Sequence, residues 1–289
     1  MVKLATAREA RLYGPALAAR RWEYINAGVY VFAALLLVLA AGVVLAAAAL
    51  SVSASASASA ARAGLAVAAV ALAAAAAVNA HDLAAHLAGV DCRVGLARYD
   101  AQLGLVEFLV PAMHAAGCAF AVVGLALLVS HSQHLEGKGA AEHGRREAHA
   151  AIMLLVAALL WVLGSVLNSC QVYERGDGRA QLLQSSVQVP QLLGSLLFLV
   201  AAALNLRVVS GTGSGGDEPA WLFLAGSVLW LAAALLNVLK VFTMHQSDAL
   251  RLEKLRGGAQ EWLSRDREGR VPLNWEEAAR RRALPTELR

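Results

Sequence analysis

Long apolar runs separated by short polar segments dominate the hydrophobic pattern of this 289-residue chain. Six of these runs are at or near the length at which an α-helix crosses about 30 Å of hydrocarbon. They cover Tyr24 to Leu50, a run from Gly64 past Val78, Leu103 to Val129, Ala148 to Val172, Leu192 to Val209 and Ala220 to Leu239. The pattern predicts an all-α fold, a polytopic membrane helix bundle of six transmembrane helices.

A twelve-residue phrase occurs twice in the last two runs. GSLLFLVAAALN covers Gly194 to Asn205, and GSVLWLAAALLN covers Gly226 to Asn237. Eleven residues at about 100° each return close to the starting side of a helix, so the glycine and asparagine of each copy share a face. The glycine- and serine-rich segment between the copies predicts the turn of an antiparallel hairpin.

The repeat also predicts contacts across this hairpin. Counting outward from the middle of the turn places each asparagine level with the small pair of the other helix: Asn205 with Gly226 and Ser227, and Asn237 with Gly194 and Ser195. An amide in lipid needs a partner, and small residues let a second backbone approach closely enough to provide one, worth on the order of 1 kcal/mol. The alternative is that these are ordinary small and polar residues of alanine-rich helices.

A weaker echo of the phrase, WVLGSVLNSCQ, lies in the fourth run and contains Gly164 and Ser165. It predicts a small-on-small crossing between spans four and five. Three further asparagines, Asn26, Asn79 and Asn168, are expected to form hydrogen bonds between helices.

The composition indicates a membrane protein, and the sequence contains no enzyme motif. Hydrophobic residues make up 58% of the chain, charged residues 16%, and the mean hydropathy is +0.56, all unusual for a soluble domain. Cys92, Cys118 and Cys170 form no CxxC pair, so neither a disulfide framework nor a zinc site is indicated. The sequence contains no glycine-rich phosphate loop, nucleophile elbow or acid-base carboxylate pair. We therefore expect no cofactor and no catalytic residue.

Basic residues gather at the two ends. With the N-terminus inside, 20 of the 25 Lys and Arg lie on one side of the membrane, which predicts cytoplasmic termini. The predicted organisation is a basic N-tail at 1–23, helices one to four at 24–187, the hairpin at 188–242 and a basic C-tail at 243–289. We expect the tails to contact membrane lipid through its anionic headgroups, and we expect no nucleic-acid partner.

Part of the C-tail has apolar residues at helical spacing: Leu252, Leu255, Ala259, Trp262 and Leu263. Beside many basic residues, this pattern favours a helix on the cytoplasmic membrane surface, interrupted at Gly257 and Gly258. A solvated tail is the alternative.

Ionisable groups inside a membrane are costly, so they are the default candidates for function. Four of them lie at the facing ends of spans two and three, namely His81, Asp82, His86 and Glu107, and a fifth, His114, shares a face of span three with Glu107. If the first four converge at the inner face, their nitrogen and carboxylate ligands could bind a divalent metal or line a proton path. The simpler alternative is that they are interfacial residues that hydrogen-bond one another, because no ligand spacing here is diagnostic. Pro111 cannot donate to the carbonyl of Glu107 and predicts a kink there.

A histidine-box di-iron membrane oxidase is a second alternative. His81 and His86 form H-x4-H, and His131 and His134 form H-x2-H. The chain lacks the His-His pairs of such enzymes, and the predicted topology places the two boxes on opposite sides of the membrane.

The hairpin phrases LLGSLLFLVAAALN and WLFLAGSVLWLAAALLN resemble the YrhK-like domain, a short two-helix membrane module. The longer chain, with YINAGVYVF, LVEFLVPAM, NSCQVYE and LRLEKLRGGAQE, resembles multi-span membrane proteins of plants. These resemblances imply a membrane hairpin within a larger bundle and carry over no catalytic residue.

The favoured function is a structural, interaction or regulatory component of a membrane, with protein partners or a homo-oligomer possible. The alternative is a transporter or channel for protons or a divalent metal that uses the face of Glu107 and His114.

Overall fold

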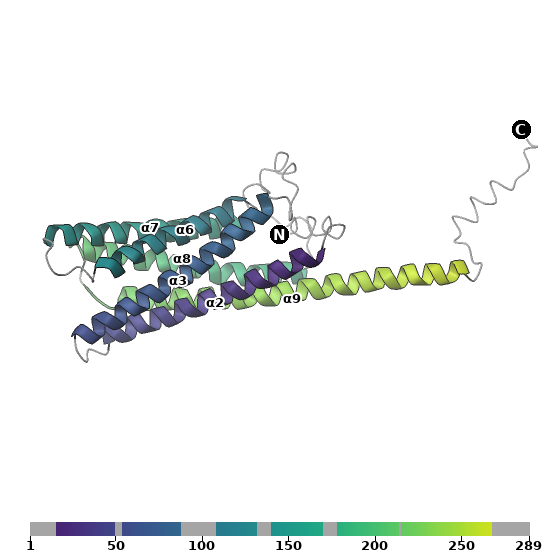
Figure 1. Ribbon diagram of the computed structural model, residues 1–289, viewed down its shortest axis with the longest axis horizontal. Coiled ribbons are helices and arrows are strands. Elements are labelled where there is room, and N and C mark those ends of the chain that lie inside the picture. Colours follow the sequence, from purple (N-terminus) through teal and green to yellow (C-terminus); the bar gives the residue numbers. More distant parts are fainter. Residues whose placement is uncertain are drawn as a thin grey trace, which may run out of the picture. The chain divides into compact units, whose positions relative to one another are not determined.

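The computed structural model describes residues 16–49, 54–87, 108–131, 140–169, 178–213 and 215–267 (Figure 1). The helices in these ranges are α2 (Ala16–Ala49), α3 (Ala54–Leu87), α6 (Val110–His131), α7 (Ala140–Ser169), α8 (Gly178–Val209) and α9 (Glu218–Arg267). Within the same ranges there is no strand. Each of the six helices contains a stretch of 21 to 30 residues that is long and apolar enough to cross a membrane. The prediction of an all-α polytopic bundle with six spans is confirmed.

The helices that follow one another in the chain pack together. Helix α2 lies along α3, α3 along α6, α6 along α7, and α7 along α8. Helix α9 contacts α8 through facing glycines, and its Trp230 lines a pocket with residues of α2 and α3. The chain up to Val241 forms one compact unit, and the residues from Phe242 onward form a second. The spans therefore belong almost wholly to the first unit.

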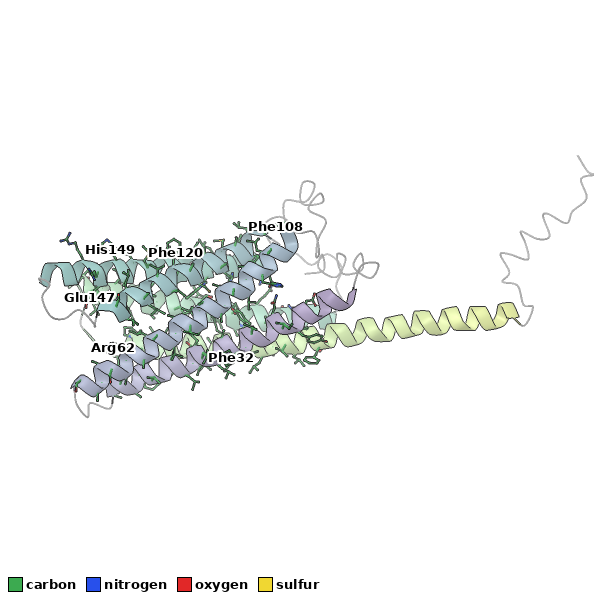
Figure 2. The ribbon with its side chains drawn as sticks, viewed as in Figure 1. Phe32, Arg62, Phe108, Phe120, Glu147 and His149 are labelled. Atoms are coloured by element: carbon green, nitrogen blue, oxygen red, sulfur yellow. The ribbon has the colours of Figure 1, made fainter. Side chains whose placement is uncertain are left out.

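Residue size differs between the inside and the outside of this bundle. Its buried core is rich in alanine, including Ala40, Ala71 and Ala157. Large apolar side chains such as Phe32 and Phe120 are instead exposed on the outer surface (Figure 2). Because lipid tails are as apolar as leucine, exposed large side chains cost nothing there, and small interior residues let the helices approach closely.

The pairing of α2 with α3 shows this close approach. A Cβ added to Gly64 would lie 3.0 Å from the carbonyl oxygen of Ala40 on α2. Farther along the same pair, the hydroxyl of Ser57 donates a hydrogen bond to the carbonyl of Ala47. At both contacts the backbones of α2 and α3 lie very close together. A larger side chain at Gly64 would prevent this approach.

Helix α8 ends in a glycine turn. Gly211 has a φ of 75°, a conformation that glycine adopts without steric cost. Its N–H donates to the carbonyl of Val208 and the N–H of Thr212 donates to that of Arg207, both at 3.0 Å, which is a Schellman motif. A Cβ on Gly213 would lie 3.3 Å from backbone and side-chain carbons of Arg207. After the turn the chain therefore folds back against the end of α8.

This turn sets a register for α8 and α9 that differs from the predicted one. A Cβ on Gly194 would lie 2.9 Å from the carbonyl oxygen of Gly226, and a Cβ on Gly226 would lie 3.1 Å from that of Gly194. The two Gly-Ser pairs thus meet each other. Asn205 and Asn237 each lie eleven residues, roughly 16 Å, farther along their helices.

The predicted contacts of each asparagine with the Gly-Ser pair of the other helix are therefore wrong. The count assumed that the linker divides evenly between the two helices. In the structure the chain turns at Gly211, directly after α8, and then folds back before α9 begins. The linker residues after the turn therefore all belong to the α9 side of the hairpin.

Two predictions concerned breaks in the helices. Pro111 is the second residue of α6 and follows a π-helical turn at residues 108–109, an arrangement that accommodates the missing N–H donor. Glu107, where a kink was expected, lies outside the described residues. Gly257 and Gly258 do not interrupt the C-terminal helix, because α9 continues through them to Arg267.

We expect Gly194→Ala to destabilise the bundle by about 1–3 kcal/mol, as overpacking does. The new Cβ would meet the backbone of Gly226, which cannot rotate away, at 2.9 Å. A thiol-reactive fluorophore can report thermal unfolding in detergent through the buried Cys118, once Cys92 and Cys170 are replaced by Ser.

The matched control is Gly42→Ala. A Cβ at Gly42 meets nothing within 4 Å, so only the gain in helix propensity, about 1 kcal/mol, applies. Equal melting temperatures for the two variants would contradict the close contact of α8 with α9.

Candidate functional site

A cluster of aromatic rings fills the centre of the bundle between α7, α8 and α9. The ring centroid of Trp161 lies 4.8 Å from that of Trp230 and 5.6 Å from that of Phe198. Phe198 in turn lies 5.0 Å from Trp230 and 5.5 Å from Phe223. The three contacts among Trp161, Phe198 and Trp230 are edge-to-face, a geometry that aromatic pairs favour.

The rings of α8 and α9 lie against glycines of the facing helix. A Cβ on Gly194 would lie 2.6 Å from Cδ1 of Trp230, and a Cβ on Gly226 would lie 2.8 Å from Cε1 of Phe198. Each helix thus supplies one glycine and one ring. The contact is reciprocal, and it explains why the repeated phrase carries a glycine and an aromatic residue four positions apart.

The same arrangement joins α6 to α7. A Cβ on Gly117 would lie 2.6 Å from Nε1 of Trp161, and a Cβ on Gly164 would lie 2.6 Å from the imidazole of His114. Here the ring precedes the glycine by three residues on both helices. The predicted packing residue Gly164 therefore lies against His114 of α6, while its neighbour Ser165 faces α8.

Ser195 on α8 is the centre of a hydrogen-bond network and is completely buried. Its hydroxyl donates to the carbonyl of Gln191 at 2.8 Å. It accepts from Nε1 of Trp230 at 3.3 Å and lies 3.3 Å from the hydroxyl of Ser165. Because a hydroxyl has one hydrogen and two lone pairs, Ser165 must be the donor in that contact. All the hydrogen-bond capacity of Ser195 is used.

The network reaches a fourth helix through Gln191. Its Nε2 donates to the hydroxyl of Tyr30 on α2 at 3.3 Å. Nearer the start of α8, Nε2 of Gln188 donates to the backbone carbonyl of Asn168 on α7 at 2.6 Å. The predicted crossing between spans four and five is therefore present and carries hydrogen bonds. Tyr30 and both glutamines were not among the predicted site residues, because helical spacing alone does not separate inward from outward polar residues.

Nε1 of Trp161 is buried and finds no strong hydrogen-bond partner in the described part of the chain. It lies against Gly117, and the thiol of Cys118, a weak acceptor, is within reach of its N–H. The ring thus packs closely with only a weak partner for its N–H.

His114 lies inside the bundle. Its Nδ1 is 3.0 Å from the carbonyl of Val110, one turn earlier in α6. Since a carbonyl only accepts, Nδ1 must carry the hydrogen. Its ring rests on Gly164, so this histidine has a clear packing role.

His81 and Asp82, which are neighbours in the chain, both contact Asn26 of α2. Nδ2 of Asn26 lies 3.1 Å from Nδ1 of His81 and donates to Oδ1 of Asp82 at 2.6 Å. Asn26 therefore forms the hydrogen bonds between helices that the sequence predicts. Asn79 forms no such bond within the described residues, where its amide donates to the carbonyl of Ala75 in its own helix.

Of the five predicted ionisable residues, the adjacent His81 and Asp82 share Asn26 as a partner, while His114 lies against Gly164. Glu107 lies outside the described residues, as does the side chain of His86. In the ranges that the structure describes, no three His, Cys, Asp or Glu side chains gather closely enough to hold a metal ion. The second histidine box also lacks described side chains.

Lys240 was missed by the sequence pattern. It lies just past the predicted end of span six, yet its side chain is buried and takes part in an interaction. A lysine directly after an apolar run is expected to be exposed, so the sequence pattern did not predict that Lys240 is buried.

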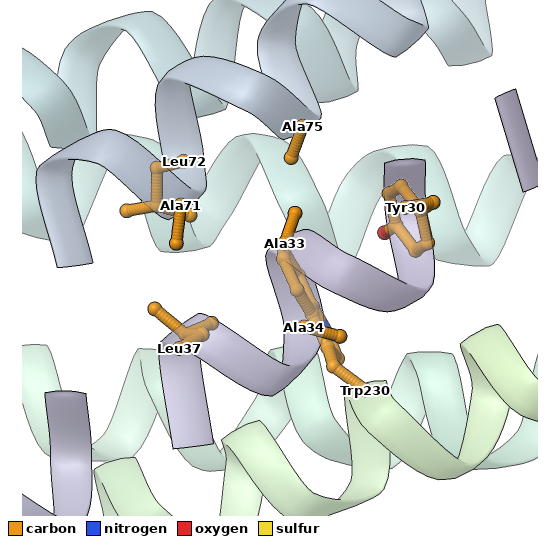
Figure 3. Close-up of a pocket in the computed structure, with 8 residues that line it drawn as sticks. All are labelled: Tyr30, Ala33, Ala34, Leu37, Ala71, Leu72, Ala75 and Trp230. Atoms are coloured by element: carbon orange, nitrogen blue, oxygen red, sulfur yellow. The ribbon is translucent and has the colours of Figure 1, made fainter. Parts of the chain in front are cut away.

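An apolar pocket opens between α2, α3 and α9 (Figure 3). It is lined by Tyr30, Ala33, Ala34, Leu37, Ala71, Leu72, Ala75 and Trp230. The space inside it is small, about 10 Å³, which is about the room that one water molecule needs. Its lining adds no cluster of charged residues to the site.

No family model matches the chain, and no solved structure matches it. The likeness of the hairpin to the YrhK-like module therefore stays a prediction.

We expect Ser195→Ala to cost about 1–2 kcal/mol, since it leaves Trp230 without its acceptor and Ser165 without its interhelical partner. The free energy can be measured by SDS-driven unfolding in mixed micelles, followed by tryptophan fluorescence.

Ser227→Ala is the matched control. Ser227 is equally buried, and its hydroxyl donates to the carbonyl of Phe223 in its own helix, as that of Ser195 does to Gln191. If both serines prove equally costly to replace, the network does not hold the helices together.

Between α2 and α3, a double-mutant cycle of Asn26→Ala with Asp82→Ala should give a coupling energy of about 1 kcal/mol, because their hydrogen bond joins the two helices. The same unfolding assay applies. A cycle of Asn79→Ala with Asp82→Ala should give a value near zero, and a coupling as large as that of Asn26 would argue against the contact.

Proposed function

We propose that this chain is a multi-pass integral membrane protein with a structural, interaction or regulatory role, and not an enzyme. The observation that carries the proposal is the use of its interior polar and aromatic groups. Ser195 directs every hydrogen bond it can make to groups within the bundle, and the central rings rest on glycines. Side chains engaged in this way hold helices together, as expected of a membrane scaffold.

The placement in the membrane is also a proposal. The excess of Lys and Arg on one side supports cytoplasmic N- and C-termini, with basic tails that contact anionic headgroups. The resemblance of the hairpin to the YrhK-like module and of the chain to plant membrane proteins supports a membrane role without a defined reaction. A plasma membrane or an endomembrane would both fit.

Reconstitution in lipid vesicles tests this proposal against transport. We expect proton and divalent-cation flux no higher than in protein-free vesicles, because the described core is closely packed. A pH-sensitive dye and a metal-sensitive dye inside the vesicles measure it. Flux that Glu107→Gln abolishes would overturn the proposal in favour of a transporter or channel.

A partner can be sought in the native membrane with photo-crosslinking residues. We expect a discrete larger product from at least one of three outward positions, Phe32, Val70 and Val200, and none from the buried Ala157. The absence of such a product at all outward positions would count against an interaction role.

A further inference from the structure

We draw no further inference here: the strongest candidate, the exposed face of α3 that carries Ala63, Ala66, Val70, Ala73, Ala77 and Ala80 at heptad spacing, is a stripe of small residues, and nothing in the structure shows what covers it.

Discussion

A polar group inside hydrocarbon must find its hydrogen-bond partners within the protein, and the rest of this bundle depends on that constraint. Ser195 meets it completely, with its single hydrogen on Gln191 and its two lone pairs facing Trp230 and Ser165. Gln191 extends the set to Tyr30. Groups on α2, α7, α8 and α9 are thereby tied to one buried site, and none of these helices can slide or rotate without leaving a donor or acceptor unpaired. The network therefore selects one arrangement even though each bond contributes little energy.

Such bonds form only if the backbones come close, and the glycines make this possible. Gly194 and Gly226 receive the rings of Trp230 and Phe198, while Gly117 and Gly164 receive those of Trp161 and His114. Lipid tails compete equally for apolar surface, so the gain comes from dense van der Waals contact of a flat ring on bare backbone. A β-carbon at any of these glycines would lose that contact.

The sequence was sufficient for the number and type of helices, because twenty-residue apolar runs have one stable form in lipid. It also marked Gly164, Ser165, Gly194, Ser195, Gly226 and Ser227 as packing residues, and all six are buried. The register of α8 against α9 could not be predicted from the sequence, because it depends on the path of the eight-residue linker, which folds back after Gly211. The aromatic partners could not be predicted from it either. Nine residues place Trp221 and Trp230 on opposite sides of α9, but only the structure shows that Trp230, 3% exposed, faces inward while Trp221 is 58% exposed.

The polar and ionisable residues were the hardest to interpret, because the same residue types occur in binding sites and in contacts between helices. Asn26 has two amide hydrogens, and both are directed at α3, one to Asp82 and one to His81. An amide nitrogen can only donate, so Nδ1 of His81 is the acceptor in this contact, which ties its side chain to a neighbouring helix. The contacts of Asn26 with α3 therefore do the same as those around Ser195: they help to fix which helix lies beside which.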